Sequence, residues 1–349
     1  MSSNVPYPPA TATGIGSMPG TDPRETARQV TDILAAFPFL PELPARGPGA
    51  DMIGRTAGAL LTGGLTVELL PSGWRLDELP HAPRDARRAA AHLREDLDAL
   101  EEFTQGFEGP LKVQAVGPWT LAATLELRSG QPVLADRGAR RDLAVSLAEG
   151  LRGHLAEVRR RIPGARPVLQ LDEPSLPAVQ QGRIRTASGF GTVPAPDKAD
   201  VESVLKDVIG ALDAPAVVHC CAPGTPIALL HRAGAAAVAV DMSLLTERDE
   251  EPLGELIESG RGLLAGAVAT APTTGDTSNP RATGLSDPGG SVGVVRTLWR
   301  RLGLDPRTLP ASVAVTPACG LAGASPRYAR SVLEHCVRAA KTLHDDPEG

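Results

Sequence analysis

The sequence predicts an α/β fold, a single (β/α)₈ TIM barrel, from its length and from the order of its secondary-structure signals. Eight short apolar runs alternate with longer stretches of helical pattern, and this alternation is typical of a parallel sheet. The chain has 349 residues, a length that such barrels commonly reach as one domain. Apolar residues make up 42% of the chain, enough to fill one large core.

The eight runs are short, and several are apolar throughout, as expected of parallel strands that are buried on both faces. They span residues 11–18, 65–70, 111–117, 167–172, 216–221, 236–241, 262–268 and 312–317. Stretches with helical propensity span residues 84–108, 139–161, 200–212, 226–232, 252–259, 292–302 and 326–344. Asp22 and Pro23 have the residue types of a helix cap and a first turn.

An open, doubly wound sheet is the main alternative to the barrel. Such a sheet usually has a glycine-rich phosphate turn after its first strand. Here the first strand ends in the segment 14–19, which has Gly14 and Gly16 but lacks the third glycine. Two segments, 182–199 and 270–290, are expected to be loops near the strand ends, where either could cover a site.

Composition and charge exclude several classes of protein. The formal net charge is -6 and acidic and basic residues are interspersed, so we expect no nucleic-acid partner. No apolar run reaches the roughly 18 residues of a membrane span. Four cysteines in a chain of this length predict a cytoplasmic protein with reduced thiols. The polar, proline-rich residues 1–10 predict a flexible N-terminal arm, followed by a catalytic barrel domain over residues 11–345.

Reactive side chains stand at the ends of several predicted strands, which is where barrel enzymes carry their catalytic groups. The strand-end segments are Gly117-Pro118-Trp119-Thr120, Asp172-Glu173-Pro174, His219-Cys220-Cys221, Asp241, and Thr316-Pro317-Ala318-Cys319-Gly320. Trp119 could stack on a planar ligand or belong to the core or a lid. A carboxylate at Asp172 or Glu173 could bind the ammonium group of an amino acid, or could instead support a neighbouring side chain or cap a helix.

Zinc is the metal that suits this set of strand ends. His219 and Cys221 are two residues apart on a strand, so their side chains point to the same face, and Cys220 points to the other. Cys319 can approach from the eighth strand and Asp241 from the sixth. Thiolate and imidazole ligands favour zinc and disfavour magnesium or calcium. The alternative is that these are small buried residues, since free cysteine packs like a small hydrophobic side chain.

These motifs resemble the C-terminal catalytic barrel of cobalamin-independent methionine synthase, in the wider group that includes uroporphyrinogen decarboxylase. The chain is most similar to the short, core-only members. The matching segments are Ile15-Gly16-Ser17-Met18-Pro19, Asp51-Met52-Ile53, Val116-Gly117-Pro118-Trp119-Thr120, Gln170-Leu171-Asp172-Glu173-Pro174, His219-Cys220-Cys221 and Thr316-Pro317-Ala318-Cys319-Gly320-Leu321.

The resemblance implies transfer of a methyl group to the sulfur of homocysteine, giving methionine. It implies a zinc ion held by His219, Cys221 and Cys319, with Asp241 in place of the family's glutamate. It further implies that Asp172 binds the substrate amino group and that Ile15 and Ser17 contact the amino acid. The methyl donor implied is either a methyl-folate or a methylated corrinoid protein.

One departure from the family keeps a second acceptor open. Arg46 stands near the place of a glutamate that helps to grip the substrate amine. Since an arginine prefers an acidic group, the acceptor could be another small thiol, such as a coenzyme M-like compound. A barrel that binds zinc without catalysing a reaction is the non-enzymatic alternative.

Overall fold

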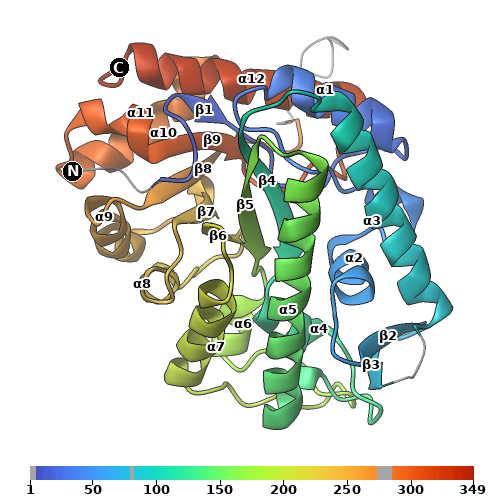
Figure 1. The fold of residues 1–349 in the computed structure, drawn as a ribbon. Helices are drawn as coiled ribbons and strands as arrows, with labels where there is room; N and C mark the ends of the chain where they lie inside the picture. Colours follow the sequence, from blue (N-terminus) through green and yellow to red (C-terminus); the bar gives the residue numbers. More distant parts are fainter. Residues whose placement is uncertain (1–4, 79–81, 273–284) are drawn as a thin grey trace.

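The protein has an α/β fold built on a curled parallel sheet, as the alternation of signals predicts (Figure 1). The structure is a computed structural model and describes residues 5–78, 82–272 and 285–349. Seven parallel strands form the sheet in the order β1-β9-β8-β7-β6-β5-β4. They are β1 (Thr11–Ala12), β4 (Gly109–Val116), β5 (Ala165–Asp172), β6 (Ala216–Cys220), β7 (Ala237–Asp241), β8 (Gly262–Val268) and β9 (Val313–Pro317).

The prediction of a complete eight-stranded barrel is wrong in one strand, and the first strand is shorter than the predicted run 11–18, since only Thr11–Ala12 pair in the sheet. The run 65–70 does form a strand, β2 (Leu65–Leu70), but it pairs antiparallel with β3 (Gly73–Glu78) in a separate hairpin beside the sheet. Leu70 pairs with Gly73, so only two residues connect the strands, and such a tight turn favours local pairing over a crossover into the sheet. The described sheet is therefore TIM-like but is not a closed barrel of eight strands.

An irregular segment, residues 38–42, lies in the space between β1 and β4. On one side, the backbone N–H of Leu40 donates to the carbonyl of Lys112 at 2.9 Å. On the other side, the N–H of Glu42 donates to the carbonyl of Gly16 at 3.0 Å. Pro38 and Pro41 have no N–H to donate, so the segment makes isolated bridges rather than a ladder.

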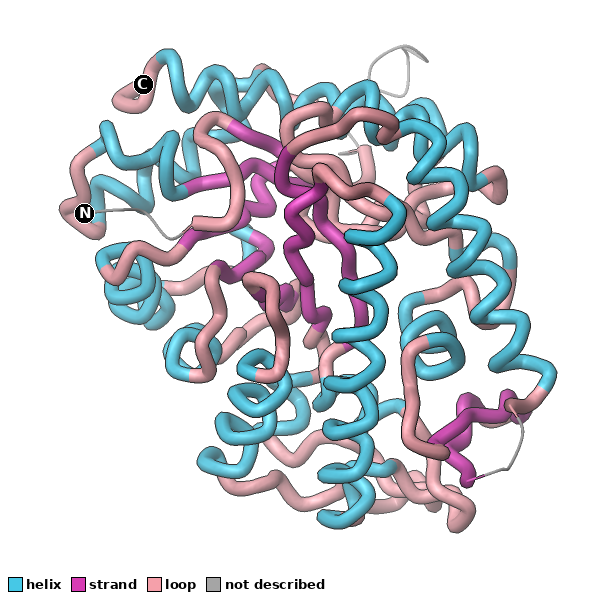
Figure 2. Tube along the Cα trace, viewed as in Figure 1, coloured by secondary structure: helices cyan, strands magenta, loops and turns pink. Residues whose placement is uncertain are grey.

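Helices cover the outer face of the sheet, and loops gather at the ends of the strands (Figure 2). The α-helices are α1 (Pro23–Ile33), α2 (Met52–Ala59), α3 (Arg84–Phe103), α4 (Pro118–Thr124), α5 (Arg137–Arg161), α6 (Leu176–Gln180), α7 (Lys198–Gly210), α8 (Ile227–Arg232), α9 (Glu250–Glu258), α10 (Pro288–Arg301), α11 (Leu309–Ser312) and α12 (Pro326–Asp345). Asp22 caps α1 through the backbone N–H groups of Arg24 and Glu25, as predicted.

The interior of the sheet is closed at its amino-terminal end by buried side chains. Tyr7 packs against Phe37, and its hydroxyl donates to the carbonyls of Leu263 (3.2 Å) and Ser312 (2.9 Å). The arm that we expected over residues 1–10 is described only from Val5, and Tyr7 within it is buried. The expected loop 270–290 lies largely outside the described residues. In the described part of the chain, no helix combines the length and apolar character needed to cross a membrane.

Candidate metal centre

The predicted strand-end residues meet at the carboxyl edge of the sheet. His219 lies in β6, where it pairs in register with Asp172 of β5. Cys221 follows β6 directly, and Cys319 lies two residues beyond the end of β9. Because parallel strands all end at the same edge, residues that are 98 positions apart in the sequence come into contact here.

One nitrogen and two sulfurs form the centre. One possible ligand atom from each of His219, Cys221 and Cys319 lies within 4.8 Å of the others. The sulfurs of Cys221 and Cys319 are 2.9 Å apart, and both cysteines are free thiols. Nε2 of His219 is buried and has no hydrogen-bond partner in the described part of the chain. An orphaned imidazole nitrogen beside two thiols is a donor set that suits zinc.

The electrostatics of the three side chains favour ionised cysteine. The hydrogen bond between the two sulfurs lowers the pKa of Cys319 to about 4 and raises that of Cys221. Burial alone would lower the pKa of His219, but the hydrogen bond to Asp172 and the adjacent Cys319 raise it to about 9. A positive charge is thus stabilised at the point where a bound cation would lie.

Asp172 orients the histidine. Its Oδ1 lies 2.7 Å from Nδ1 of His219 and accepts a second hydrogen bond of 2.7 Å from Nε2 of Gln170. An imidazole whose Nδ1 donates to a carboxylate presents Nε2 as the ligand atom, which is the common arrangement at zinc sites. Gln170 also donates to the carbonyl of Ile15 at 2.8 Å, so the same network reaches the first strand end.

The segment around Ile15 and Ser17 lies against the Cys319 loop. The backbone N–H of Leu321 donates to the carbonyl of Ser17 at 2.8 Å. A Cβ atom at Gly320 would lie 2.0 Å from Oγ of Ser17, so a larger residue there would displace the Ser17 hydroxyl. The two residues that we expected to contact an amino-acid substrate are therefore held next to the cysteine pair.

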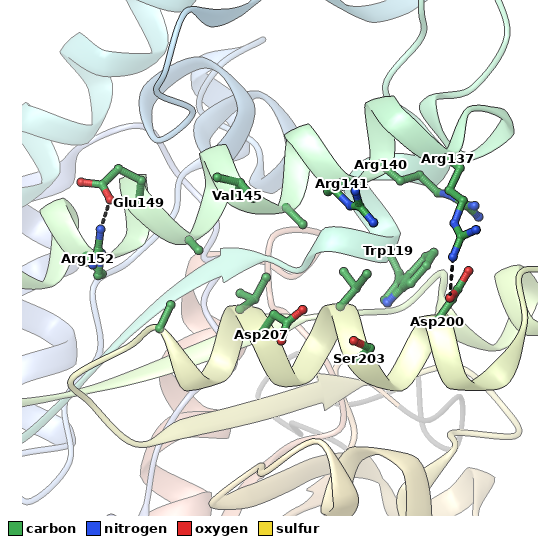
Figure 3. A pocket seen from close by; sticks show the side chains of 15 residues that line it. Trp119, Arg137, Arg140, Arg141, Val145, Glu149, Arg152, Asp200, Ser203 and Asp207 are labelled. Atoms are coloured by element: carbon green, nitrogen blue, oxygen red, sulfur yellow. Dashed lines mark hydrogen bonds and ion pairs between the residues drawn. The ribbon is translucent and has the colours of Figure 1, made fainter.

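Two of the expected site residues have other contacts in the structure. Asp241 ends β7, and its Oδ1 accepts hydrogen bonds from the backbone N–H (2.9 Å) and the hydroxyl (2.7 Å) of Ser243. It is not a member of the three-residue group. Trp119 lies in the groove between α5 and α7, where its indole N–H donates to the carbonyl of Val201 at 3.1 Å (Figure 3).

Sequence reasoning missed two buried charges near the centre. Lys112 of β4 is fully buried and donates from Nζ to the carbonyl of Ile15 at 2.8 Å. Glu42 is 3% exposed and accepts a hydrogen bond of 3.2 Å from Gln114. Burial raises the pKa of Glu42 to about 7, and the charge of Asp172 acts in the same direction. Lys112 could have been found from the sequence, because it is a charged residue within a mostly apolar predicted strand.

The arginine that departs from the family pattern is engaged elsewhere. Arg46 makes hydrogen bonds of 2.6 and 2.7 Å to the two carboxylate oxygens of Asp96 in α3. Asp96 also binds Arg55 at 3.0 Å. This buried network joins α2, α3 and the segment that precedes α2. Arg46 thus has a structural partner, and Glu42 is an acidic side chain whose pKa is raised by burial and by the charge of Asp172.

Glu173 has the helix-cap role that we considered for it. Its two carboxylate oxygens accept from the backbone N–H groups of Trp119 (2.9 Å) and Thr120 (2.7 Å) at the start of α4. Burial raises its pKa to about 7 in spite of these hydrogen bonds. A Cβ atom at Gly117 would lie 2.3 Å from the same carboxylate, which explains the glycine before α4.

Comparison with solved structures finds the same fold in methyl-transferring proteins. The chain is similar to a B12-independent methionine synthase from Shewanella sp. W3-18-1 in complex with selenomethionine, with a TM-score of 0.58 and 14% identity over 97% of this chain and 98% of that chain. A methyltransferase from Methanosarcina mazei matches with a TM-score of 0.51 and 14% identity over 99% of this chain and 95% of that one. At this identity the likeness establishes a shared fold. A scan against family models and a search of curated proteins both find no match.

Proposed function

We propose that the protein is a zinc-dependent methyltransferase that moves a methyl group to the sulfur of homocysteine and so forms methionine. The observation that carries the proposal is the buried, unpartnered Nε2 of His219 beside the sulfurs of Cys221 and Cys319. The fold shared with a methionine synthase and a second methyltransferase supports it.

The chemistry follows from the acidity of thiols. A free thiol has a pKa of about 8.5 and is mostly protonated at neutral pH, where it is a poor nucleophile. Zinc held by His219, Cys221 and Cys319 would act as a Lewis acid that presents the substrate sulfur as a thiolate. Asp172 keeps the imidazole in its ligating orientation. The strand ends hold the acceptor so that the methyl group can approach in line.

An amino-acid acceptor fits the charges around the centre. Asp172 and Glu42 are acidic and buried, and they would offer carboxylates to an ammonium group, which would share them with the buried cation Lys112. The strand end at Ile15 and Ser17 lies beside Cys319 and offers backbone groups to the rest of the amino acid. The structural neighbour from Shewanella was solved with selenomethionine, an amino acid of the same kind as the proposed product.

Two other functions stay open, and each predicts a different observation. A coenzyme M-like thiol would need a cation to bind its acidic group, but Arg46, the residue that suggested it, is paired with Asp96. A zinc-binding protein without catalytic activity would need a closed set of four protein ligands. Among the described residues the group has three members, which favours a site that exchanges its fourth ligand. Asp241 is the proposed fourth ligand, a weak one that the substrate sulfur would displace.

The decisive test is metal content followed by X-ray absorption at the zinc edge. We expect about one zinc per chain in the purified protein, and a new sulfur neighbour of the metal when homocysteine is added. Methyl transfer is then assayed with a methyl-folate and with a methylated corrinoid protein, because the sequence resemblance leaves both donors open. Zinc without a new sulfur neighbour would contradict the proposal and favour another thiol or a non-catalytic site.

Adjacent cysteines provide a matched control. Cys221→Ser should lose the metal, whereas Cys220→Ala should retain it, because Cys220 is buried on the other face of β6 and is not in the group. Loss of zinc in both variants would indicate a general folding defect. Full methyl transfer by Cys319→Ser would contradict the proposed role of the centre.

A further inference from the structure

A groove of about 380 Å³ runs between α5 and α7 on the outside of the molecule. Small apolar side chains line its centre. They are Ala144, Val145 and Ala148 of α5, Val204 and Val208 of α7, and Ala211, which follows α7. Val145 is 66% exposed, whereas nearly all other large apolar side chains in the described part of the chain are covered. Figure 3 shows Val145 on α5 between two groups of charged residues, with Glu149 and Arg152 on one side and the arginines near the start of the helix on the other. An apolar surface of this kind, bordered by polar groups, is typical of a protein interface.

The charges in the groove are mixed, which argues against a ligand of one sign. Four arginines line it, but so do Glu149, Asp200 and Asp207. Two of the arginines are already engaged, Arg137 with Asp200 and Arg152 with Glu149. A nucleic acid or a simple anion would favour a groove of uniformly positive charge.

Three of the charges have no opposite charge beside them in the described part of the chain. Arg140 lies over the ring of Trp119 with its guanidinium carbon 5.8 Å from the ring centroid, and neither Arg140 nor Arg141 has an ion-pair partner there. Asp207 likewise has none. Cations from α5 and an anion from α7 thus line one groove and stay unpaired within a single copy of the chain.

The exposed stripe of α5 is self-complementary about Val145. Arg141 lies four residues before Val145 and Glu149 lies four residues after it, so all three share one face of the helix. If two copies of α5 pack antiparallel around a two-fold axis at Val145, Arg141 of each copy lies opposite Glu149 of the partner subunit, whose carboxylate would then be shared with Arg152 of its own chain. Such self-complementarity is the property that a two-fold interface requires.

The available surface is large enough for a stable pair. α5 has 25 residues and is therefore about 38 Å long, and α7 lies alongside it for 13 residues. Each helix is about 10 Å wide and α7 covers only about 20 Å of that length, so the joint face is roughly 600 Å² per partner, at the lower end of the range for specific interfaces. The small side chains of Ala144 and Ala148 allow the helices to approach closely.

We propose that the groove between α5 and α7 is the interface of a two-fold homodimer, centred on Val145 and aligned by Arg141 and Glu149. The interface lies on the outer face of the helices and does not include the metal centre. The mass of the full chain in solution tests it, since light scattering after size exclusion should give about twice the 36.2 kDa of one chain. A monomer at tens of micromolar would overturn the proposal.

A substitution in the groove and a matched one outside it locate the interface. Val145→Glu should convert the dimer to a folded monomer with an unchanged circular dichroism spectrum. Val337→Glu places the same charge on α12, at another partly exposed valine, and should leave the dimer intact. A dimer that survives Val145→Glu would overturn the assignment of this surface.

Complementary charge variants test the two-fold arrangement. Arg141→Glu alone places two acidic side chains opposite each other in the dimer, and Glu149→Lys alone places two basic ones. Each variant should dimerise at least tenfold more weakly than the wild type. When the two variants are mixed, each acidic side chain at position 141 or 149 of one variant lies opposite a basic side chain of the other. The mixture should therefore form a heterodimer of near wild-type affinity. Failure to form that heterodimer, with both variants folded, would overturn the antiparallel arrangement.

Discussion

Oδ1 of Asp172 lies 2.7 Å from Nδ1 of His219, on a neighbouring strand and at the same register. The same carboxylate oxygen accepts a hydrogen bond from Gln170. The sequence resemblance assigned Asp172 to the substrate, whereas this contact shows that Asp172 orients His219, a proposed metal ligand. The two roles are compatible because the carboxylate has a second oxygen.

Asp172→Asn should therefore weaken zinc binding. An amide can still fill the space, but it no longer holds Nδ1–H of His219 by a charged hydrogen bond, and such partners commonly contribute about tenfold to hundredfold in metal affinity. Competition with a chelator measures the change. An unaltered zinc affinity combined with a raised KM for homocysteine would show that Asp172 serves the substrate alone.

Asp241→Asn tests the proposed fourth ligand. Three ligand atoms cluster without Asp241, and one of its oxygens is engaged by Ser243. We therefore expect this variant to retain about one zinc per chain and to lose much less affinity than Cys221→Ser. Chelator competition on both variants gives the comparison. Equal losses in the two would establish Asp241 as a ligand of the same weight as the cysteines.

The pKa of Glu42 predicts a stability that depends on pH. Its pKa is raised from 4.5 to about 7 by burial, so between these values the folded protein holds a proton that the unfolded chain has released. The stabilising contribution is complete below pH 4.5 and is lost as the pH rises through 7, by at most about 1.4 kcal/mol per pH unit.

Glu42→Gln should reduce this slope. Urea unfolding of the metal-free protein at several pH values between 4.5 and 7.5 measures it, and the difference between wild type and variant isolates Glu42 from the other titrating groups. Part of the dependence of stability on pH should remain in the variant, because Glu173 also has a pKa of about 7. Parallel profiles for the two proteins would contradict the raised pKa of Glu42.

The residues of the candidate metal centre were easier to predict from the sequence than the fold around them. The spacing of His219 and Cys221 fixes their common face by strand geometry alone, and Cys319 follows from its own strand end. The run 65–70 has the composition of a barrel strand, but composition does not reveal the partner with which a strand pairs. Trp119 follows a strand end too, and only the packing of α4 places its ring in the groove between α5 and α7.

Glu42 and Arg46 show why the surroundings of the centre could not be predicted in full. Glu42 lies in a proline-rich segment that reads as a loop, and it enters the interior because isolated bridges fix that segment between β1 and β4. Arg46 has its partner, Asp96, 50 residues further along the chain. Neither contact leaves a local signal in the sequence.

Lys112 is expected to stabilise the protein through the acidic groups near it, and its removal should be felt most when Glu42 is ionised. Burial lowers the pKa of Lys112 to about 8, while Asp172 and Glu42 act against that shift. Lys112→Met deletes the cation and one donor to the carbonyl of Ile15. We expect a loss of about 3 kcal/mol of unfolding free energy at pH 7.5, where Glu42 is mostly ionised and Lys112 is mostly protonated, because a buried charge then loses its counterpart.

At pH 6 the loss should be smaller, because the pKa of Glu42 rises further without Lys112 and the carboxyl accepts a proton in the folded state. The double variant Lys112→Met/Glu42→Gln should remove this extra dependence on pH, since neither charge is left to respond. Lys341→Met, on the exposed face of α12, is the control and should change stability by less than about 0.5 kcal/mol. Equal losses at pH 6 and pH 7.5 for Lys112→Met would mean that the lysine acts only through its hydrogen bond to Ile15.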